Sequence, residues 1–294
     1  HDAVQDLTIL RQATGLSPRN VFDTRVAAGF VGLACTVSLR DLLADLVGVE
    51  LEKTETRTDW LQRPLADTQV GYAEDDVRYL VDAYEELVRR ARERNVWDWM
   101  QEEMRGLDEA SLYEERDPRE EFRRVKGYGK LRREELAVLR ELAAWREQVA
   151  RAIDRPRGRV ASDKLLLFLS QRQPTRMEDL GEVRSLRRRD VEDHGEALVR
   201  AVNAGLQLDP AAWPNGPPRL HHDRALEMRC RAASARVKER AQARDIDPGL
   251  VATRADVRGL VREGPEKEAG SNRLAGGWRW TLVGEEVAAE FHEP

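Results

Sequence analysis

The chain has 294 residues, of which 41% are hydrophobic and 35% are charged. Such a length exceeds one ordinary hydrophobic core and predicts two or three domains of roughly 100 residues each. The formal net charge of -5 excludes nucleic-acid binding through overall charge, so any such function must depend on local basic patches.

Helix signals dominate the first part of the chain. A helix is predicted to start after Ser38 and to stop at Gly48, an N-cap followed by a C′ glycine. A long helix is predicted from Asp67, its expected cap, to about Arg94, and its apolar stripe comprises Ala73, Val77, Leu80, Tyr84 and Leu87. Strand signals are thin, and residues 20–23 are the best candidate.

Proline, glycine and charge divide the chain into three parts. Residues 113–130 and 209–219 are predicted to be linkers, because they carry prolines, glycines and many polar side chains. Between and after them, residues 131–208 and 220–294 are predicted to be helical units. Helix starts are expected at Ser162 or Asp163, at the capping box Thr175–Glu178, and at Thr253.

Cys35 and Cys230 are far apart in the sequence and lack metal-ligand spacing. They are therefore interpreted as reduced thiols of a cytoplasmic protein. No stretch approaches the ~20 apolar residues of a membrane span. Because the chain begins with His1 rather than methionine, we expect it to be a piece of a longer protein.

Two aspartates and a tyrosine are the candidate catalytic residues. Tyr72 and Asp76 are four residues apart and share a face on a helix. Asp6 borders the apolar side of a short amphipathic segment, where a carboxylate needs a partner such as a cation or an arginine. The plain alternative for Asp6 and Asp76 is a surface or salt-bridged aspartate. Glu74 and Asp75 are expected to be solvated charges.

The order and spacing of several motifs in residues 1–112 resemble the ribonuclease D family of 3′→5′ exonucleases. The motifs are Val21–Thr24, Leu51–Trp60, Arg63-Pro64-Leu65 and Tyr72–Val77, together with the segment around Asp6. The resemblance implies the later part of a ribonuclease H-like α/β exonuclease domain. It also implies that Asp6 and Asp76 bind two divalent ions, Mg²⁺ or Mn²⁺, and that Tyr72 positions the attacking water.

Residues 131–208 resemble the HRDC domain, an all-α bundle that accompanies ribonuclease D, and residues 220–294 resemble a more divergent second copy. The expected fold is thus predominantly α, with two HRDC bundles after the exonuclease part. HRDC domains bind nucleic acid, and the candidate RNA-binding residues are Arg187, Arg188, Arg189, Arg236, Lys238 and Arg240. Balanced, solvated helix faces are the alternative. Trp278 and Trp280 flank Arg279 and can stack on unpaired bases, although at least one is expected to be buried.

The family's Asp-x-Glu motif on an early strand is expected to lie upstream of His1. Asp6 and Asp76 alone supply two negative charges against the four positive charges of two divalent ions, so this chain alone is expected to be inactive or nearly so. The predicted parent function is 3′→5′ trimming of structured RNA such as tRNA precursors, releasing 5′-mononucleotides, with no membrane or protein partner. Two alternatives remain: a non-catalytic RNA-binding protein that uses its HRDC modules, and a DNA-directed exonuclease of the same superfamily.

Overall fold

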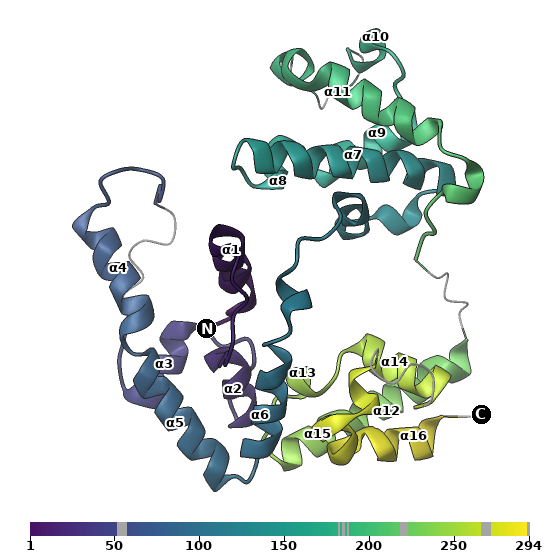
Figure 1. Ribbon diagram of the computed structural model, residues 1–294. Helices are drawn as coiled ribbons and strands as arrows, with labels where there is room; N and C mark the ends of the chain where they lie inside the picture. The colour runs from purple at the N-terminus through teal and green to yellow at the C-terminus, as the bar shows by residue number, and fades with distance from the viewer. Residues whose placement is uncertain are drawn as a thin grey trace. The chain divides into compact units, whose positions relative to one another are not determined.

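The computed structural model describes residues 1–51, 58–181, 183, 186, 188–217, 223–265 and 272–292. Within these ranges every regular element is a helix and no strand is formed (Figure 1). The prediction of a predominantly helical chain is therefore confirmed, whereas the strand expected at residues 20–23 is wrong. Asp23 is instead the N-cap of a helix. The chain divides into two compact units, one of residues 1–114 and 222–294 and the other of residues 115–221.

The first unit is built from two separate stretches of sequence. Its early helices are α1 (Val4–Thr14), α2 (Thr24–Phe30), α3 (Leu39–Val47), α4 (Asp67–Arg78), α5 (Leu80–Glu93), α6 (Trp97–Gly106) and η1 (Ala110–Tyr113). Its later helices are α12 (Arg224–Ala243), α13 (Pro248–Val251), α14 (Arg254–Glu263), η5 (Arg273–Ala275), α15 (Gly277–Arg279), the π-helical turn η6 (Trp280–Gly284) and α16 (Glu285–Phe291).

One hydrophobic core joins these two stretches, with buried residues from α2, α3, α5 and α6 and from α12 to α16. The rings of Phe30 and Trp278 lie 4.9 Å apart between their centroids. The backbone N–H of Asp247 donates to the Gly29 carbonyl oxygen at 2.8 Å. The segments 1–112 and 220–294, which the sequence divides into two domains, therefore pack together around a single core. Their evolutionary division into two domains remains a prediction.

A buried ion pair fixes this junction. Arg279, which is 8% exposed, donates two hydrogen bonds to the carboxylate of Glu103 in α6, at 2.6 and 2.8 Å. The indole N–H of Trp278 donates to the same carboxylate at 3.1 Å. Arg279 also donates to the carbonyl oxygens of Leu250 and Val251, at 3.1 and 3.0 Å. Such bidentate, charge-assisted contacts hold α6 and α15 in one register.

The ends of the helices in the structure can be compared with the helix starts and stops predicted from the sequence. Ser38 accepts the Asp41 N–H at 3.2 Å and Gly48 adopts a left-handed φ of 70°, so both predicted ends of α3 are confirmed. Thr253 caps α14 as predicted. The single long helix from Asp67 to Arg94 is wrong, because it breaks at Tyr79 into α4 and α5.

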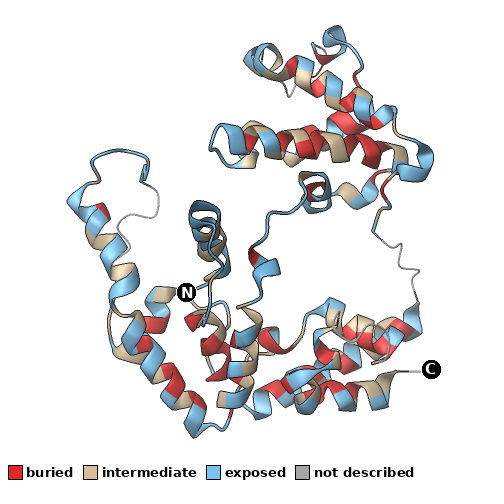
Figure 2. Ribbon diagram, viewed as in Figure 1, coloured by how far each residue is buried: buried red, intermediate tan, exposed pale blue. Residues whose placement is uncertain are grey.

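The predicted apolar stripe crosses this break and is only partly buried. Leu87 is fully buried, but Val77 is 63% exposed and Tyr84 is 42% exposed. Figure 2 shows the contrast between α4, with few buried residues, and α5, which contributes several to the core. Because α4 and α5 are separate helices, the residues of the predicted stripe do not form one continuous buried face.

The second unit surrounds α7. Its elements are η2 (Pro118–Arg124), η3 (Tyr128–Lys130), α7 (Arg133–Ala152), α8 (Arg157–Val160), α9 (Asp163–Arg172), α10 (Met177–Leu180), α11 (Arg188–Leu206) and η4 (Pro210–Ala212). Phe122 and Val125 are buried in its core, so part of the predicted linker 113–130 belongs to the packed unit. Ser162 caps α9 as predicted. The box expected at Thr175 is shifted by one residue, because Asp179 accepts the Arg176 N–H at 3.0 Å.

The contact between α7 and α11 leaves no room for a side chain at Gly205. A Cβ there would lie 2.5 Å from the Val138 Cα and 3.0 Å from the Ala137 carbonyl oxygen, both backbone atoms. We expect Gly205→Ala to lower the free energy of unfolding by about 1–3 kcal/mol, because backbone cannot yield as a flexible side chain does. Urea denaturation with hydrogen exchange of α7 and α11 peptides measures this.

Gly158→Ala is the matched control. It changes a helical glycine of the same unit, and a Cβ there meets no atom within 4 Å. Alanine is intrinsically the better helix former, so this variant should match or slightly exceed the wild type in stability. Equal stability of the two variants would contradict the close helix contact.

Candidate active site

Helix α4 carries two of the three candidate catalytic residues. Its N-terminus is tied to the preceding loop by the side chain of Gln69, which is 5% exposed. Gln69 accepts the Ala66 N–H at 2.9 Å and donates to the Asp59 carbonyl oxygen at 3.4 Å. The expected cap at Asp67 is wrong by one residue, because the N-cap residue is Ala66. The same loop places the Trp60 ring 6.0 Å from the ring of Tyr72.

Tyr72 and Asp76 lie one turn apart on α4, and both are half-buried. Partial burial, followed by the negative charges of Asp75 and Asp6, raises the pKa of the Asp76 carboxyl above its ordinary value. Burial and the charge of Asp76 raise the pKa of the Tyr72 phenol. The negative charge of Asp6, from a different helix, thus acts on Asp76. That the two carboxylates share one site stays a prediction.

Helix α1, which carries the exposed Asp6, is anchored through Asp23 rather than through a core of its own. No residue of α1 is buried. The Asp23 side chain, in a residue that is 2% exposed, accepts the N–H groups of Asp2 and Ala3 at 3.1 and 2.6 Å. It also accepts those of Arg25 and Val26 at 2.8 and 3.3 Å, so one carboxylate caps α2 and holds the two residues that precede α1.

Asp23→Ala is expected to loosen α1 without unfolding the first unit, because the other anchors of that unit lie in its core. Losing a cap of this kind costs about 1–2 kcal/mol. Hydrogen exchange of the peptide that contains α1 should become faster, whereas exchange in α5 and α6 should stay unchanged. Uniformly faster exchange throughout the unit would show that Asp23 supports the whole core instead.

The neighbouring carboxylates have other partners. Glu74 and Asp75 pair with Arg78 at 3.0 and 3.8 Å on the exposed face of α4, as expected for solvated charges. Across the described ranges, no group of three or more histidine, cysteine, aspartate or glutamate side chains is arranged to hold a metal ion. The carboxylates of Asp6 and Asp76 are oxygen donors of the kind that hard divalent cations prefer.

The predicted RNA-binding arginines are largely ion-paired. Arg188 and Arg189 are exposed and pair with Glu192 and Asp193 at 2.9 and 3.4 Å. On α12, Arg236 contacts Glu286 and Glu290, and Arg240 contacts Glu286 at 2.7 Å. Lys238 is exposed, and Arg187 lies outside the described residues. The paired arginines therefore agree with the alternative interpretation, in which acidic neighbours balance the charges on solvated helix faces.

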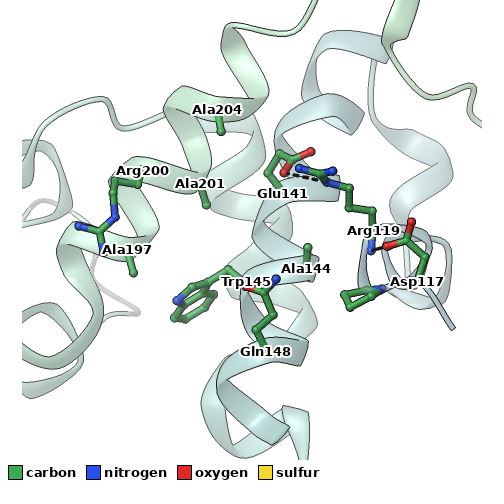
Figure 3. A pocket seen from close by; sticks show the side chains of 11 residues that line it. Asp117, Arg119, Glu141, Ala144, Trp145, Gln148, Ala197, Arg200, Ala201 and Ala204 are labelled. Carbon is green, nitrogen blue, oxygen red and sulfur yellow. Dashed lines mark hydrogen bonds and ion pairs between the residues drawn. The ribbon is translucent and has the colours of Figure 1, made fainter. Parts of the chain in front are cut away.

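The second unit has a cavity of about 540 Å³ between η2, α7 and α11 (Figure 3). Both arginines that line this cavity form ion pairs: Arg119 with Glu141 at 3.4 Å and Arg200 with Glu196 at 3.3 Å. The half-buried Trp145 lines the cavity, and its indole nitrogen has no hydrogen-bond partner among the residues that the structure describes. None of the candidate catalytic residues lies in this unit.

Sequence reasoning assigned no role to Asp23, Gln69 or Trp60, although all three shape the surroundings of Asp6 and Tyr72. Asp23 precedes a helix start and has the composition of a cap, which is a usable local signal. Trp60 and Gln69 act across a loop, and no periodicity predicts their positions.

In the part of the chain that the structure describes, no helix is both long and apolar enough to cross a lipid bilayer.

Comparison with known proteins connects these features to a family. Residues 1–92 match a 3′-5′ exonuclease domain family and residues 135–202 match the HRDC domain family. Ribonuclease D of Desulfotalea psychrophila is 35% identical over 283 residues, covering 95% of this chain and 74% of that protein. Ribonuclease D of Pseudomonas paraeruginosa is 38% identical over 218 residues, covering 74% of this chain and 57% of that protein.

The fold agrees with this relationship. The crystal structure of Escherichia coli RNase D, an exoribonuclease involved in structured RNA processing, superimposes with a TM-score of 0.82 at 24% identity. The match covers all of this chain and 79% of that one. With an exonuclease match over α1 to α5, an HRDC match over α7 to α11 and relatives that share most of its length, the chain belongs to the ribonuclease D family of 3′–5′ exoribonucleases.

Proposed function

We propose that Asp6, Tyr72 and Asp76 are the catalytic residues with which this chain takes part in hydrolysing the 3′-terminal phosphodiester bond of RNA. The observation that carries the proposal is the electrostatic coupling of the three side chains. Burial raises the pKa of both Asp76 and Tyr72; the charges of Asp75 and then Asp6 add to the shift of Asp76, and the charge of Asp76 adds to that of Tyr72. Like charges brought together in this way favour a cation between them.

Exonucleases of this family generally depend on divalent metal ions, and we propose Mg²⁺ or Mn²⁺ here. The carboxylate donors Asp6 and Asp76 fit one such ion in chemistry and charge. A pair of ions carries four positive charges, which two carboxylates do not balance. When bound, divalent ions would supply acidity to a coordinated water and stabilise charge on the leaving 3′-oxygen.

The tyrosine has a separate role in this proposal. Its phenolic O–H can donate a hydrogen bond, and its oxygen can accept one. It lies one turn from Asp76 and can therefore orient a water toward a phosphate held at the carboxylates. Trp60, 37% exposed and beside Tyr72, offers an apolar surface next to that position.

We propose structured RNA, such as tRNA precursors, as the substrate and 5′-mononucleotides as the products. The Escherichia coli relative is an exoribonuclease involved in structured RNA processing, and this chain shares its fold. The two free thiols Cys35 and Cys230 agree with a location in the cytoplasm. Exposed basic side chains such as Lys238 would add salt-dependent, sequence-independent affinity for the RNA backbone.

We also propose that the 294-residue chain has little or no activity alone, because its described carboxylates do not complete a metal site. The test is trimming of 5′-labelled RNA with Mg²⁺ or Mn²⁺, by this chain and by a version that carries an added Asp-x-Glu segment from a relative. We expect stepwise shortening from the 3′ end only with the added segment, and 5′-mononucleotides as the only small product.

Each other outcome has a clear meaning. Strong metal-dependent trimming by the chain alone would refute the proposed inactivity. RNA binding without trimming by either version would favour the non-catalytic binding protein. Faster trimming of a matched DNA strand than of RNA would favour a DNA-directed exonuclease.

A further inference from the structure

A second cavity lies in the first unit, apart from the residues proposed for catalysis. It has a volume of about 490 Å³ and is formed by α6, the end of α12 and the segment from η6 to α16. We call it the Trp99 pocket, and the residues that matter for its chemistry are Trp99, Arg240, Arg244, Trp280 and Glu286. Trp99 and Trp280 are both half-buried, so part of each indole is exposed to solvent.

A continuous stack of rings and guanidinium groups runs from the core to this pocket. Arg279 lies over the Trp278 ring at 4.5 Å, and Trp278 stacks on Trp99 at 5.9 Å with an interplanar angle of 24°. The outer face of Trp99 is covered by the guanidinium of Arg244 at 5.1 Å. Glu103 holds both Arg279 and Trp278 by hydrogen bonds, so the ring on which Trp99 stacks is fixed in place.

Arg244 differs from the other arginine of the pocket. Arg240 is held by two hydrogen bonds to Glu286, at 2.7 and 2.9 Å. Arg244 is exposed and pairs with no carboxylate in the described ranges, where its side chain contacts the face of Trp99. A planar cation on an aromatic face occupies the position that a stacked base would take, and an exposed arginine can leave it cheaply.

The pocket wall next to Trp280 has an unusual backbone. Residues Trp280–Gly284 form a π-helical turn, a rare element that often accompanies functional sites. Gly284 is required there, because a Cβ would lie 2.1 Å from the Leu274 carbonyl oxygen. The wide turn thereby places Trp280 and the exposed Thr281 at the cavity.

We propose that the Trp99 pocket binds one unpaired nucleotide of an RNA strand. Its base stacks on Trp99, with Trp280 at its side, and Arg244 moves from the ring to the adjacent phosphate. Rigid aromatic faces with a nearby mobile cation are the features that bind single-stranded nucleic acid without sequence preference. The inference rests on the proposed RNA substrate, but it concerns binding and needs no catalysis.

The test measures binding of a short fluorescent oligouridylate by anisotropy, in EDTA, with the full 294-residue chain. Arg244→Ala should weaken binding about threefold to tenfold and reduce the slope of log affinity against log salt by about one. Trp99→Leu should weaken it about tenfold, because stacking contributes about 1–3 kcal/mol per base. An oligomer of abasic nucleotides should lose most of the Trp99→Leu effect.

Arg92→Ala is the matched control. Arg92 covers the ring of Trp97, also in α6, at 5.4 Å, but neither residue lines the pocket. This variant should bind oligouridylate as the wild type does. Unchanged binding by folded Arg244→Ala, or an equal loss in Arg92→Ala, would overturn the proposal. If the chain binds as proposed but the version with the added Asp-x-Glu segment fails to trim RNA, only the catalytic proposal would be contradicted.

Discussion

Replacing Asp76 by asparagine is expected to lower 3′ trimming of RNA by at least about a thousandfold, or about 4 kcal/mol of transition-state stabilisation. Asparagine keeps the size of the side chain and removes its charge, which the coupling to Asp6 identifies as the important property. The measurement is single-turnover trimming by the version that carries the Asp-x-Glu segment. Asp6→Asn should have an effect of similar size, since both carboxylates are proposed ligands of the same cation.

Glu74→Gln provides the control for this comparison. Glu74 lies on the same helix, two residues from Asp76, and its carboxylate pairs with Arg78 on the exposed face. Its loss should change the rate less than about threefold, because exposed ion pairs contribute little. Similar losses in Glu74→Gln and Asp76→Asn would mean that α4 contributes general negative charge and no specific ligand.

Glu103→Ala is expected to destabilise the first unit by about 3–5 kcal/mol. The substitution leaves the buried guanidinium of Arg279 without its counter-charge. Removing one partner of a buried ion pair destabilises a protein far more than replacing both partners by apolar residues. Denaturant unfolding, with hydrogen exchange of peptides from α6 and α15, measures the loss. The second unit should exchange as in the wild type.

Glu93→Ala is the corresponding surface control. Glu93 pairs with Arg89 on α5, and both side chains are more than half exposed. Removing that pair should change stability by less than about 1 kcal/mol. If Glu103→Ala were equally mild, the junction between α6 and α15 would depend on apolar packing alone.

The same ion pair predicts a pH dependence. Burial alone would raise the pKa of Glu103, but hydrogen bonds from Arg279 and Trp278 and the charges of Arg279 and Arg273 outweigh it and lower the pKa below its ordinary value of 4.5. A carboxylate with a lowered pKa in the folded state stabilises that state fully above its ordinary value, and the contribution is lost as the pH falls below it. Unfolding of Glu103→Gln should therefore vary less with pH in that acidic range than unfolding of the wild type.

Local sequence signals predicted local structure well. The caps at Ser38, Ser162 and Thr253 correspond to real helix starts, because capping depends on residues within one turn. The break at Tyr79 was missed because nothing in the sequence there resembles a helix stop, with neither glycine nor proline at hand. Residues 20–23 have a strand-like composition, but Asp23 caps α2 and also bonds the backbone just before α1.

Within the candidate site, the spacing of Tyr72 and Asp76 predicted a shared helix face because helical geometry fixes that relation. The approach of Asp6 could be inferred only through family resemblance, since it depends on the packing of α1. The pair of Glu103 and Arg279 is separated by 176 residues, and no local pattern connects them. The sequence could not show that Arg236 and Arg240 on α12 are ion-paired, because their partner Glu286 lies on α16.

The two-stretch composition of the first unit has a consequence for biosynthesis. Its core requires Val287 and Trp278 as well as Phe30, so it cannot close until the ribosome has translated almost the whole chain. Residues 115–221 are contiguous and can fold while the remainder is still being made. The apolar faces of α2, α5 and α6 therefore remain uncovered until the segment that carries Trp278 and Val287 has been translated.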